Sequence, residues 1–271
     1  SATPDPDLAQ ILDGLLFVPS GILNQRFHNY LKRFSDSQYA QDYIGILHCV
    51  AEGQNKIKDI AHILKKPQTV ISSRVSFLLE ADALTRSGDF LKIDDRVFSF
   101  WLRFVYQGKL NALTFDAQNQ RAIFRRHIEA MMHEFLASAS KKLPERITEM
   151  VRMFCDERVQ IEKKSLRLTH FREIKPVEFN NRSLKDGLVC RSGDGMWLIG
   201  CKQDAISEDD ITLFSRECKK YRHKLERKVL VTLADIDQNS RLRAMDENIL
   251  TWDLNSINQM LDLFSKPRII V

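Results

Sequence analysis

The sequence predicts an α+β protein of more than one domain, in which N-terminal helices precede an α/β domain with a central mixed sheet. Three observations predict this class. Helical apolar periodicity dominates the first part of the chain. Two short apolar runs, separated by a glycine-containing loop, lie within residues 185–203 and predict a β-hairpin. A further apolar run at residues 228–233 follows a helical stretch, and a strand reached through a crossover helix pairs in parallel within its sheet.

Residues 1–37 are expected to form a helical segment or linker. The chain begins with a Pro-containing linker-like stretch, and an amphipathic run from Leu8 to Phe17 precedes a second helical pattern through Leu23 and Leu31. No candidate catalytic residue lies here. We expect this segment to pack on something upstream of it.

Residues 38–95 have a specific order of elements. Apolar periodicity predicts three helices, near residues 43–50, 58–64 and 70–79, and Ser87-Gly88-Asp89 then predicts a turn between two short strands. Three helices followed by a β-ribbon are the order of a winged helix-turn-helix. We therefore predict such a module within residues 38–110.

The third helix of a winged helix-turn-helix lies in the DNA major groove, so its polar positions are candidates for DNA contact. Two basic residues flank the predicted wing. The candidates are Gln68, Thr69, Ser72, Ser73, Arg74, Arg86 and Lys92. The alternative is a protein-docking module, because Arg74 is the only basic residue between Thr69 and Leu79.

An Asp and a Phe-Trp-Leu-Arg-Phe run follow the module directly, in the stretch from Ile93 to Val105. This region resembles the one after the nucleotide-binding core in archaeal-type ATPases of the STAND/AAA-like group, whose C-terminal part is a restriction-endonuclease-like module called DUF234. The chain has no GxxxxGK[ST] phosphate loop. The resemblance thus implies an upstream ATPase domain of the same protein as a partner. It also implies that ATP binds only through a missing N-terminal domain.

The hairpin at 185–203 carries the strongest candidate site. Asp186 opens its first arm and Lys202 closes its second, so we expect both side chains at one end of adjacent antiparallel strands, facing a common cleft. This pair resembles the D…(D/E)xK site of the PD-(D/E)xK nucleases, in which two acids hold a divalent metal and the Lys orients the attacking water. Here the motif is Gly200-Cys201-Lys202, with glycine at the position of the second acid.

The resemblance implies a degenerate catalytic site of Asp186 and Lys202, with Asp186 as the sole carboxylate for Mg²⁺. A helix over residues 121–139 resembles the first helix of the fold, where Glu129, and secondarily Glu134, is a candidate acid or an ordinary solvent-facing charge. One carboxylate holds Mg²⁺ weakly. Gly200→Glu should therefore raise Mn²⁺ affinity. In the alternative, an active nuclease, the acid has migrated; the candidates are Glu178, Asp204, Glu208 and Asp209.

The elements over residues 111–271 predict the α-β-β-β-α-β order of that superfamily. We expect a short helix at 144–154, one or more strands within 166–179 and, after the hairpin, a helix at 208–225. A strand at 228–233, a strand at 248–254 and a helix at 256–264 should close the domain.

The charge is unevenly distributed along the chain. The formal net charge is +5, and residues 216–228 hold seven Lys or Arg against two Glu. Such a cluster can neutralise phosphates, although a solvated helix face explains it equally well. The candidate phosphate ligands are Arg216, Lys219, Lys220, Arg222 and Lys224.

The sequence also limits the compartment and the chemistry. The five cysteines are scattered without a CxxC pair, which predicts neither disulfides nor a zinc site but small buried side chains. No apolar run is long enough to span a bilayer and no signal peptide is evident, so we expect a cytoplasmic protein. Together the features predict a DNA-binding, regulatory C-terminal module of a larger ATPase. The alternatives are an active metal-dependent nuclease and a protein-interaction platform.

Overall fold

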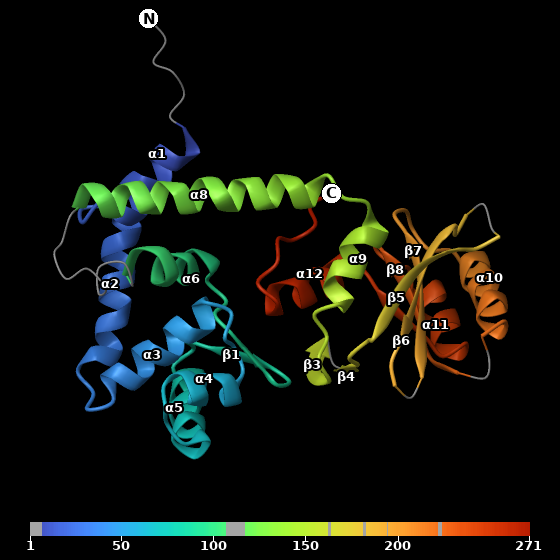
Figure 1. The fold of residues 1–271 in the computed structure, drawn as a ribbon, viewed down its shortest axis with the longest axis horizontal. Helices are drawn as coiled ribbons and strands as arrows, with labels where there is room; N and C mark the ends of the chain where they lie inside the picture. The colour runs from blue at the N-terminus through green and yellow to red at the C-terminus, as the bar shows by residue number, and fades with distance from the viewer. Residues whose placement is uncertain (1–6, 107–116, 162–163, 181–182, 194, 222–223) are drawn as a thin grey trace, which may run out of the picture. The chain divides into compact units, whose positions relative to one another are not determined.

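The structure is a computed structural model that describes residues 7–106, 117–161, 164–180, 183–193, 195–221 and 224–271. The chain divides into two compact units, Ser1–Leu136 and Ala137–Val271. Figure 1 shows helices throughout the first unit and a twisted sheet in the second. The predicted class, N-terminal helices followed by an α/β domain with a mixed sheet, is confirmed.

The first unit is helical apart from one hairpin. Its elements in chain order are α1 (Leu8–Leu12), the π-helix η1 (Asp13–Phe17), α2 (Ile22–Ser35), α3 (Ala40–Ala51), α4 (Ile57–Ile63), α5 (Gln68–Glu80), β1 (Thr85–Ser87), β2 (Phe90–Lys92), α6 (Arg96–Trp101), the π-helix η2 (Leu102–Tyr106) and most of α8 (Ala117–Ala139).

Helices α3, α4 and α5 and the β1–β2 hairpin follow the order predicted for a winged helix-turn-helix. The hairpin is antiparallel, with Arg86 opposite Leu91. Lys56, just before α4, adds an antiparallel bridge to Phe90 of β2. The turn between the strands needs Gly88, whose φ of 63° lies in the region that residues with a Cβ rarely adopt. The glycine read from the sequence as a turn signal therefore has its expected role.

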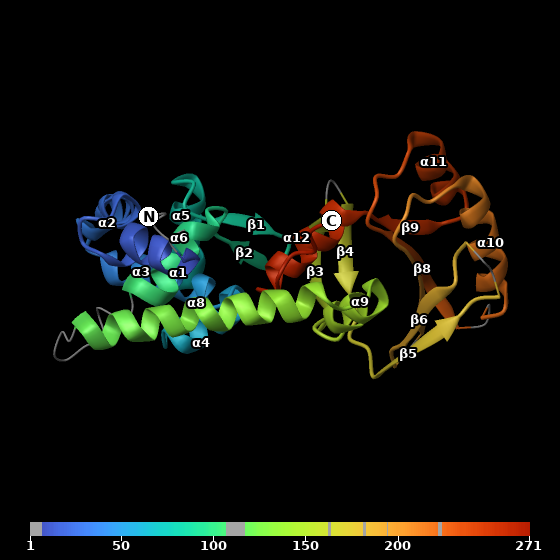
Figure 2. The same ribbon diagram turned by 90° about the horizontal axis from the view of Figure 1, so that it is seen from above.

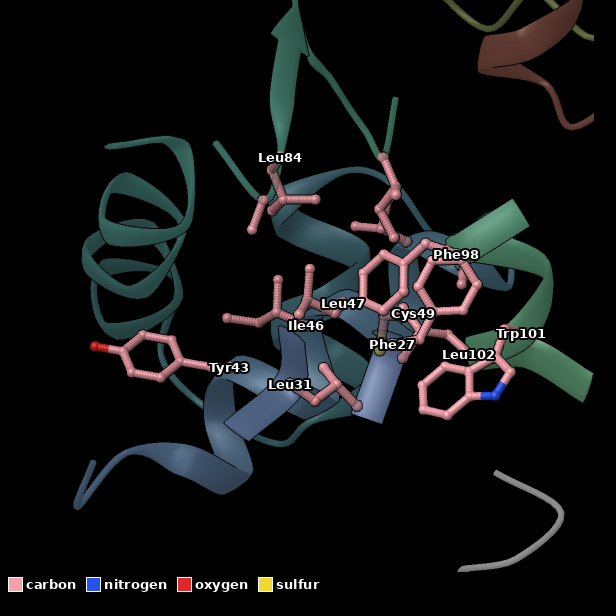
Figure 3. Packing of buried hydrophobic residues seen from close by; sticks show 14 of the residues in the cluster. Phe27, Leu31, Tyr43, Ile46, Leu47, Cys49, Leu84, Phe98, Trp101 and Leu102 are labelled. Atoms are coloured by element: carbon pink, nitrogen blue, oxygen red, sulfur yellow. The ribbon is translucent and has the colours of Figure 1, made fainter. Parts of the chain in front are cut away.

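Aromatic packing holds the helices of the first unit together (Figure 3). The ring of Phe27 in α2 lies 5.3 Å from that of Phe98 and 5.7 Å from that of Trp101, both in α6. The ring of Phe124 in α8 lies 5.5 Å from that of Phe17, which attaches the long helix to the N-terminal segment. The Phe-Trp run is thus core packing in this unit.

Residues 117–136 of α8 belong to the first unit. Besides Phe124, this helix supplies Arg121 and Arg125, which pair with the fully buried carboxylate of Asp13 in η1. The predicted domain, by contrast, begins at residue 111. Its boundary at 110/111 and the one at 37/38 stay predictions.

The second unit alternates helices and strands. Its elements in chain order are α9 (Leu143–Val151), β3 (Glu157–Ile161), β4 (Lys164–Leu168), β5 (Glu173–Glu178), β6 (Asp186–Arg191), β7 (Met196–Lys202), α10 (Glu208–Lys219), β8 (Leu225–Thr232), α11 (Gln238–Asp246), β9 (Ile249–Trp252) and α12 (Leu254–Leu263).

The main sheet is mixed, in the order β5-β6-β7-β8-β9. Strands β5, β6 and β7 are antiparallel neighbours, whereas β8 and β9 each join in parallel after a helix, as the crossover rule predicts. Helices α10 and α11 lie on one face of the sheet and α9 and α12 on the other (Figure 2). Strands β3 and β4 form a separate hairpin.

Several elements differ from the sequence prediction. Helix α10 ends at Lys219 instead of residue 225, because β8 already begins at Leu225. Helix α11 was not predicted; its buried side chains are only Ser240 and Ala244, so it has no apolar stripe. Of the cysteines, four are buried and free as predicted, but Cys155 is exposed. Burial raises the pKa of Cys190 to about 12, so this thiol stays protonated at neutral pH. No described helix is both long and apolar enough to cross a bilayer.

Removal of the Asn24 side chain should destabilise the first unit. The Asn24 amide donates to the carbonyls of Phe17 (3.1 Å) and Val18 (2.9 Å) and accepts from the Trp101 indole (3.1 Å). Because buried partners would be left unpaired, Asn24→Ala should lower the free energy of unfolding by about 3 kcal/mol. Urea denaturation followed by tryptophan fluorescence measures this. Exposed Gln25→Ala is the control and should change stability by less than about 0.5 kcal/mol; equal losses in both variants would contradict the assignment.

Candidate functional site

The register of the β6–β7 ladder decides which residues share the candidate site. Asp186 is paired with Cys201, and Gly187 with Gly200. Directly paired residues of an antiparallel ladder point to the same face, and successive residues alternate. Asp186 therefore shares a face with Cys201, and Lys202 points to the opposite face. The two residues do lie at one end of neighbouring strands, but the predicted common cleft is wrong.

Lys202 belongs instead to a polar cluster with Ser183, Ser207 and Asp210, which we call the Lys202 cluster. The Lys202 ammonium donates to Asp210 Oδ2 at 2.6 Å and to Ser183 Oγ at 3.1 Å. Ser183 Oγ donates to Asp210 Oδ1 at 2.5 Å. The backbone N–H and the hydroxyl of Ser207 both donate to Asp210 Oδ2, at 2.9 and 2.8 Å. The carboxylate thus accepts hydrogen bonds on both oxygens.

Asp210 is the acid of this cluster, and its pKa is strongly lowered. Burial by itself raises the pKa of its carboxyl group, since only 1% of the residue is exposed. The hydrogen bonds from Lys202, Ser183 and Ser207 outweigh burial and lower the pKa from 3.8 to about 2. A pKa lower in the folded state means that folding favours the ionised form. That difference stabilises the fold at neutral pH by about 2 kcal/mol.

Asp210 was missed in the sequence, although a signal for it exists. Ser207 and Asp210 form a capping box at the start of α10, in which each side chain accepts from the backbone N–H of the other residue. The pattern Ser-x-x-Asp before a helix predicts this motif. The sequence cannot show that Lys202 reaches the same carboxylate.

Gly200 is packed in the core and has no room for an acid. A Cβ at this position would lie 2.9 Å from Leu230 Cδ2 and 3.1 Å from Phe214 Cε2. Both neighbours are fully buried apolar side chains. A carboxylate at residue 200 would therefore enter the apolar layer beneath α10, where an unpaired charge is costly. The expectation that Gly200→Glu completes a metal site does not fit this packing.

Among the alternative acids, Glu178 is the one that lies beside Asp186. The β5–β6 ladder pairs Glu178 directly with Asp186, so both point to the same face. Glu178 is exposed and lies 4.0 Å from the Lys185 ammonium. Glu208 and Asp209 are exposed in the first turn of α10. Within the described residues, no three His, Cys, Asp or Glu side chains are grouped so that they could hold a metal ion.

The remaining candidate acid, Glu129, lies on the exposed side of α8 in the first unit, and Glu134 is also exposed. A role of Glu129 in catalysis stays a prediction. Asp204, just after β7, accepts a hydrogen bond from the Thr232 hydroxyl through its backbone carbonyl, at 2.7 Å. That contact ties the ends of β7 and β8 together.

The DNA-contact candidates of the first unit fall into two groups. Gln68, Thr69 and Ser73 are exposed along α5, and Arg86 is exposed on β1, whereas Ser72 is half-buried. Arg74 turns back toward the helical core: its guanidinium carbon lies 3.4 Å from the Tyr39 ring centre, and its Nε lies 3.6 Å from buried Asp42.

Arg74 is thus held by the fold instead of projecting from it, which weakens its predicted role as a DNA contact. Lys92 is an ion-pair partner of Asp94, at 2.8 Å. Residues with a fixed intramolecular partner contribute less charge to an external phosphate.

The basic cluster after α10 is spread over a helix end and a connection. Arg216 and Lys219 are exposed at the end of α10, and Lys224 is exposed just before β8. Lys220 pairs with Glu217 at 2.6 Å. Arg222 lies outside the described residues. Of the cations described in this segment, Arg216, Lys219 and Lys224 are exposed to a phosphate, whereas Lys220 already has an acidic partner.

The chain matches no protein-family model and no curated protein. Among solved structures it is similar to protein VC1899 from Vibrio cholerae, with 14% identity over 92% of this chain and 56% of that chain, at a TM-score of 0.27. It is also similar to Can2 from Sulfobacillus thermosulfidooxidans in complex with cyclic tetra-adenylate, with 9% identity over 89% and 54%, at a TM-score of 0.28. The chain spans about half the length of these proteins. TM-scores this low describe only partial likeness.

Loss of the Asp210 charge should destabilise the second unit in a pH-dependent way. At pH 7, Asp210→Asn should lower the free energy of unfolding by about 2 kcal/mol. The difference in free energy of unfolding between the unmodified chain and the variant should be fully present above about pH 4. It should disappear as the pH falls toward about 2, where Asp210 takes up a proton. Urea denaturation at several pH values, followed by tryptophan fluorescence, measures it. Exposed Asp209→Asn is the matched control; a pH-independent difference would contradict the assignment.

Gly200→Glu should destabilise the fold without creating a metal site. The new side chain must displace Leu230 and Phe214, so we expect a loss of more than about 3 kcal/mol and no gain in Mn²⁺ affinity. Denaturation and isothermal titration with Mn²⁺ are the measurements. Gly193→Glu, at an exposed turn position of the same hairpin, is the control. Tight Mn²⁺ binding by a well-folded Gly200→Glu variant would show that the packing argument is wrong.

Proposed function

We propose that this chain is a DNA-binding regulatory module in which a winged helix-turn-helix is joined to a nuclease-like domain that does not cut. The observation that carries the absence of cutting is the pairing of Lys202 with Asp210 on the face opposite Asp186. In a working site of the D…(D/E)xK kind, the lysine must reach the water held by the acid-bound metal. Here the Lys202 ammonium donates its hydrogen bonds to Asp210 and Ser183 instead.

Binding to DNA is supported by the surface of α5 and the hairpin. Gln68, Thr69 and Ser73 offer hydrogen-bonding groups on one exposed helix, and Arg86 is exposed on the wing. A recognition helix uses such side chains on base edges and phosphates. The net charge of +5 favours binding to a polyanion.

The proposed setting is the C-terminal region of a larger ATPase, as the resemblance of the Phe-Trp region implies. In that setting the upstream domain of the same protein would bind ATP and also be a partner. An active nuclease with a migrated acid is the alternative that Glu178 beside Asp186 would serve, with Mg²⁺ held by that pair.

A second candidate function, protein docking, is favoured by an apolar groove in the first unit. The groove has a volume of about 560 Å³ and is lined by residues of α1, α6 and α8, among them Leu8, Val97, Met131, Phe135 and Leu136. Leu136 is 61% exposed. Exposed apolar surface of this kind marks interaction sites in soluble proteins.

DNA binding through α5 should be lost when negative charge is placed on that helix. Thr69→Glu with Ser73→Glu should weaken binding to a duplex by more than about tenfold, because each new carboxylate would face phosphates. Fluorescence anisotropy with a labelled duplex measures affinity. Gln25→Glu with Asn29→Glu, at two exposed positions of α2 with the same spacing, is the charge-matched control. Unchanged affinity in the double variant would remove α5 from the interface and favour protein docking.

Neutralising Lys219 and Lys224 to Gln tests the basic segment separately. If both contact phosphates, the slope of log K against log salt should fall by about 0.9 for each lost contact, for every DNA sequence alike. An unchanged slope would assign these residues to a solvated surface.

The unmodified chain should not nick DNA in the presence of Mn²⁺. A plasmid-relaxation assay measures this on the protein that binds the duplex in the anisotropy experiment. Nicking that requires Mn²⁺ and is lost in both Asp186→Ala and Glu178→Ala would contradict the proposal and establish the migrated-acid alternative.

A further inference from the structure

The two outer edges of the main sheet differ in chemistry. The β5 edge carries charged Glu173, Lys175 and Glu178, together with Pro176, which has no N–H to offer. Charged residues and proline are the usual protection of an edge against pairing with another chain. The β9 edge, by contrast, is Ile-Leu-Thr-Trp and has neither. Within the described residues, β9 pairs with β8 alone.

A second strand edge faces the first. Strand β4 pairs only with β3 among the described strands, and Figure 2 shows β4 on the side of β3 toward β9. All four residues of β9 and the first three of β4, Lys164 to Leu166, line a cavity of about 440 Å³. We call this cavity the β9 slot. Its volume lies within the range of ligand-binding pockets.

The lining of the β9 slot is partly apolar and partly basic. Leu166, Leu250, Trp252 and Met245 are among the lining residues. The charged side chains that line it, among the described residues, are Lys164, Arg227 and Arg241. The slot therefore combines a surface for aliphatic side chains with positive charge.

Both arginines that line the slot are already held in position. The guanidinium carbon of Arg227 lies 5.0 Å from the Trp197 ring centre, and Arg227 Nε is 4.0 Å from Glu226. Arg241 donates to the Ile236 carbonyl at 3.1 Å and to Asp253 at 2.9 Å. Fixed side chains lose little entropy when a ligand binds. Asp253 offsets much of the Arg241 charge, so Lys164 and Arg227 supply most of the attraction for an anion.

We propose that the β9 slot binds an extended segment of a partner protein in which acidic and aliphatic side chains alternate, and which adds a strand to β9. Val229 pairs with Leu250, so Arg227 and Leu250 share one face of the sheet, whereas Ile249 packs with Ala244 of α11 on the other face. Alternation along an added strand would direct acidic side chains to the face of Arg227 and aliphatic ones to the face of Ile249. A strand edge presents both N–H donors and C=O acceptors, and a peptide backbone satisfies both. A phosphodiester backbone has no N–H to donate, which favours a peptide over a nucleic-acid strand. The proposal does not depend on DNA binding or on the nuclease-like site.

The test uses the whole chain and a fluorescein-labelled octapeptide of alternating Asp and Val, with binding measured by fluorescence anisotropy. Lys164→Gln and Arg227→Gln should each weaken binding by about fivefold, the effect of about 1 kcal/mol. Lys175→Gln, on the protected β5 edge, is the matched control and should bind as the unmodified chain does. An octapeptide of alternating Lys and Val should not bind. Lys164 is exposed, so its variant tests the charge even if Arg227→Gln alters the packing on Trp197.

Two further measurements separate strand addition from simple charge attraction. The Asp-Val peptide should slow hydrogen exchange at the amides of β9, and replacing its valines by proline should abolish binding because the backbone donors are removed. Single-stranded oligothymidylate should not displace the peptide. The proposal would be overturned by no binding of the Asp-Val peptide, by binding to the Lys164→Gln and Arg227→Gln variants as tight as to the unmodified chain, or by binding of the proline peptide as tight as that of the Asp-Val peptide. Displacement by oligothymidylate would assign the slot to nucleic acid instead.

Discussion

The β6–β7 register is the constraint on which the candidate site depends, and Gly187 helps to fix it. A Cβ at Gly187 would lie 2.4 Å from Phe179 and 2.7 Å from the carbonyl oxygen of Ile199. Asp186 could share a face with Lys202 only if β6 slipped by one residue, which reverses the facing of every side chain in the strand. Leu188 would then meet Phe179 where only glycine fits. The packing of Phe179 thus opposes the arrangement that metal-dependent chemistry would need.

The Lys202 cluster joins three segments of the chain through hydrogen bonds between a lysine, two serines and an aspartate. Ser183 lies before β6, Lys202 ends β7, and Ser207 and Asp210 begin α10. A buried ion pair gains little over apolar packing unless hydrogen bonds satisfy its remaining atoms, and breaking one is costly. Here both carboxylate oxygens are satisfied. The cluster therefore fixes the start of α10 on the sheet.

The fold could be predicted from the sequence because its signals are local. Periodicity, Gly88 and the order of elements gave the three helices with their hairpin and the mixed sheet. The face of the sheet to which Asp186 points could not be predicted, because it depends on the pairing of Arg191 with Met196 across the turn. A turn one residue longer or shorter would pair Asp186 with a different residue. The pairing of Arg74 with Asp42 and Tyr39 was likewise invisible, since it joins residues on different helices. Helix α11 has almost no apolar pattern to read.

Three separate features of this sheet oppose a metal site built from Asp186, residue 200 and Lys202. An acid at Gly200 would meet Phe214 and Leu230, Asp186 points to the other face, and Lys202 is held by Asp210. A substitution that removes one of these features leaves the other two in place, so it should not create a metal site by itself. The effects of such substitutions on metal binding are therefore not additive. Restoring such a site would require repacking beneath α10 together with release of the lysine. Release of Lys202 would in turn leave Asp210 buried without its cation, which destabilises the helix start that the cluster fixes.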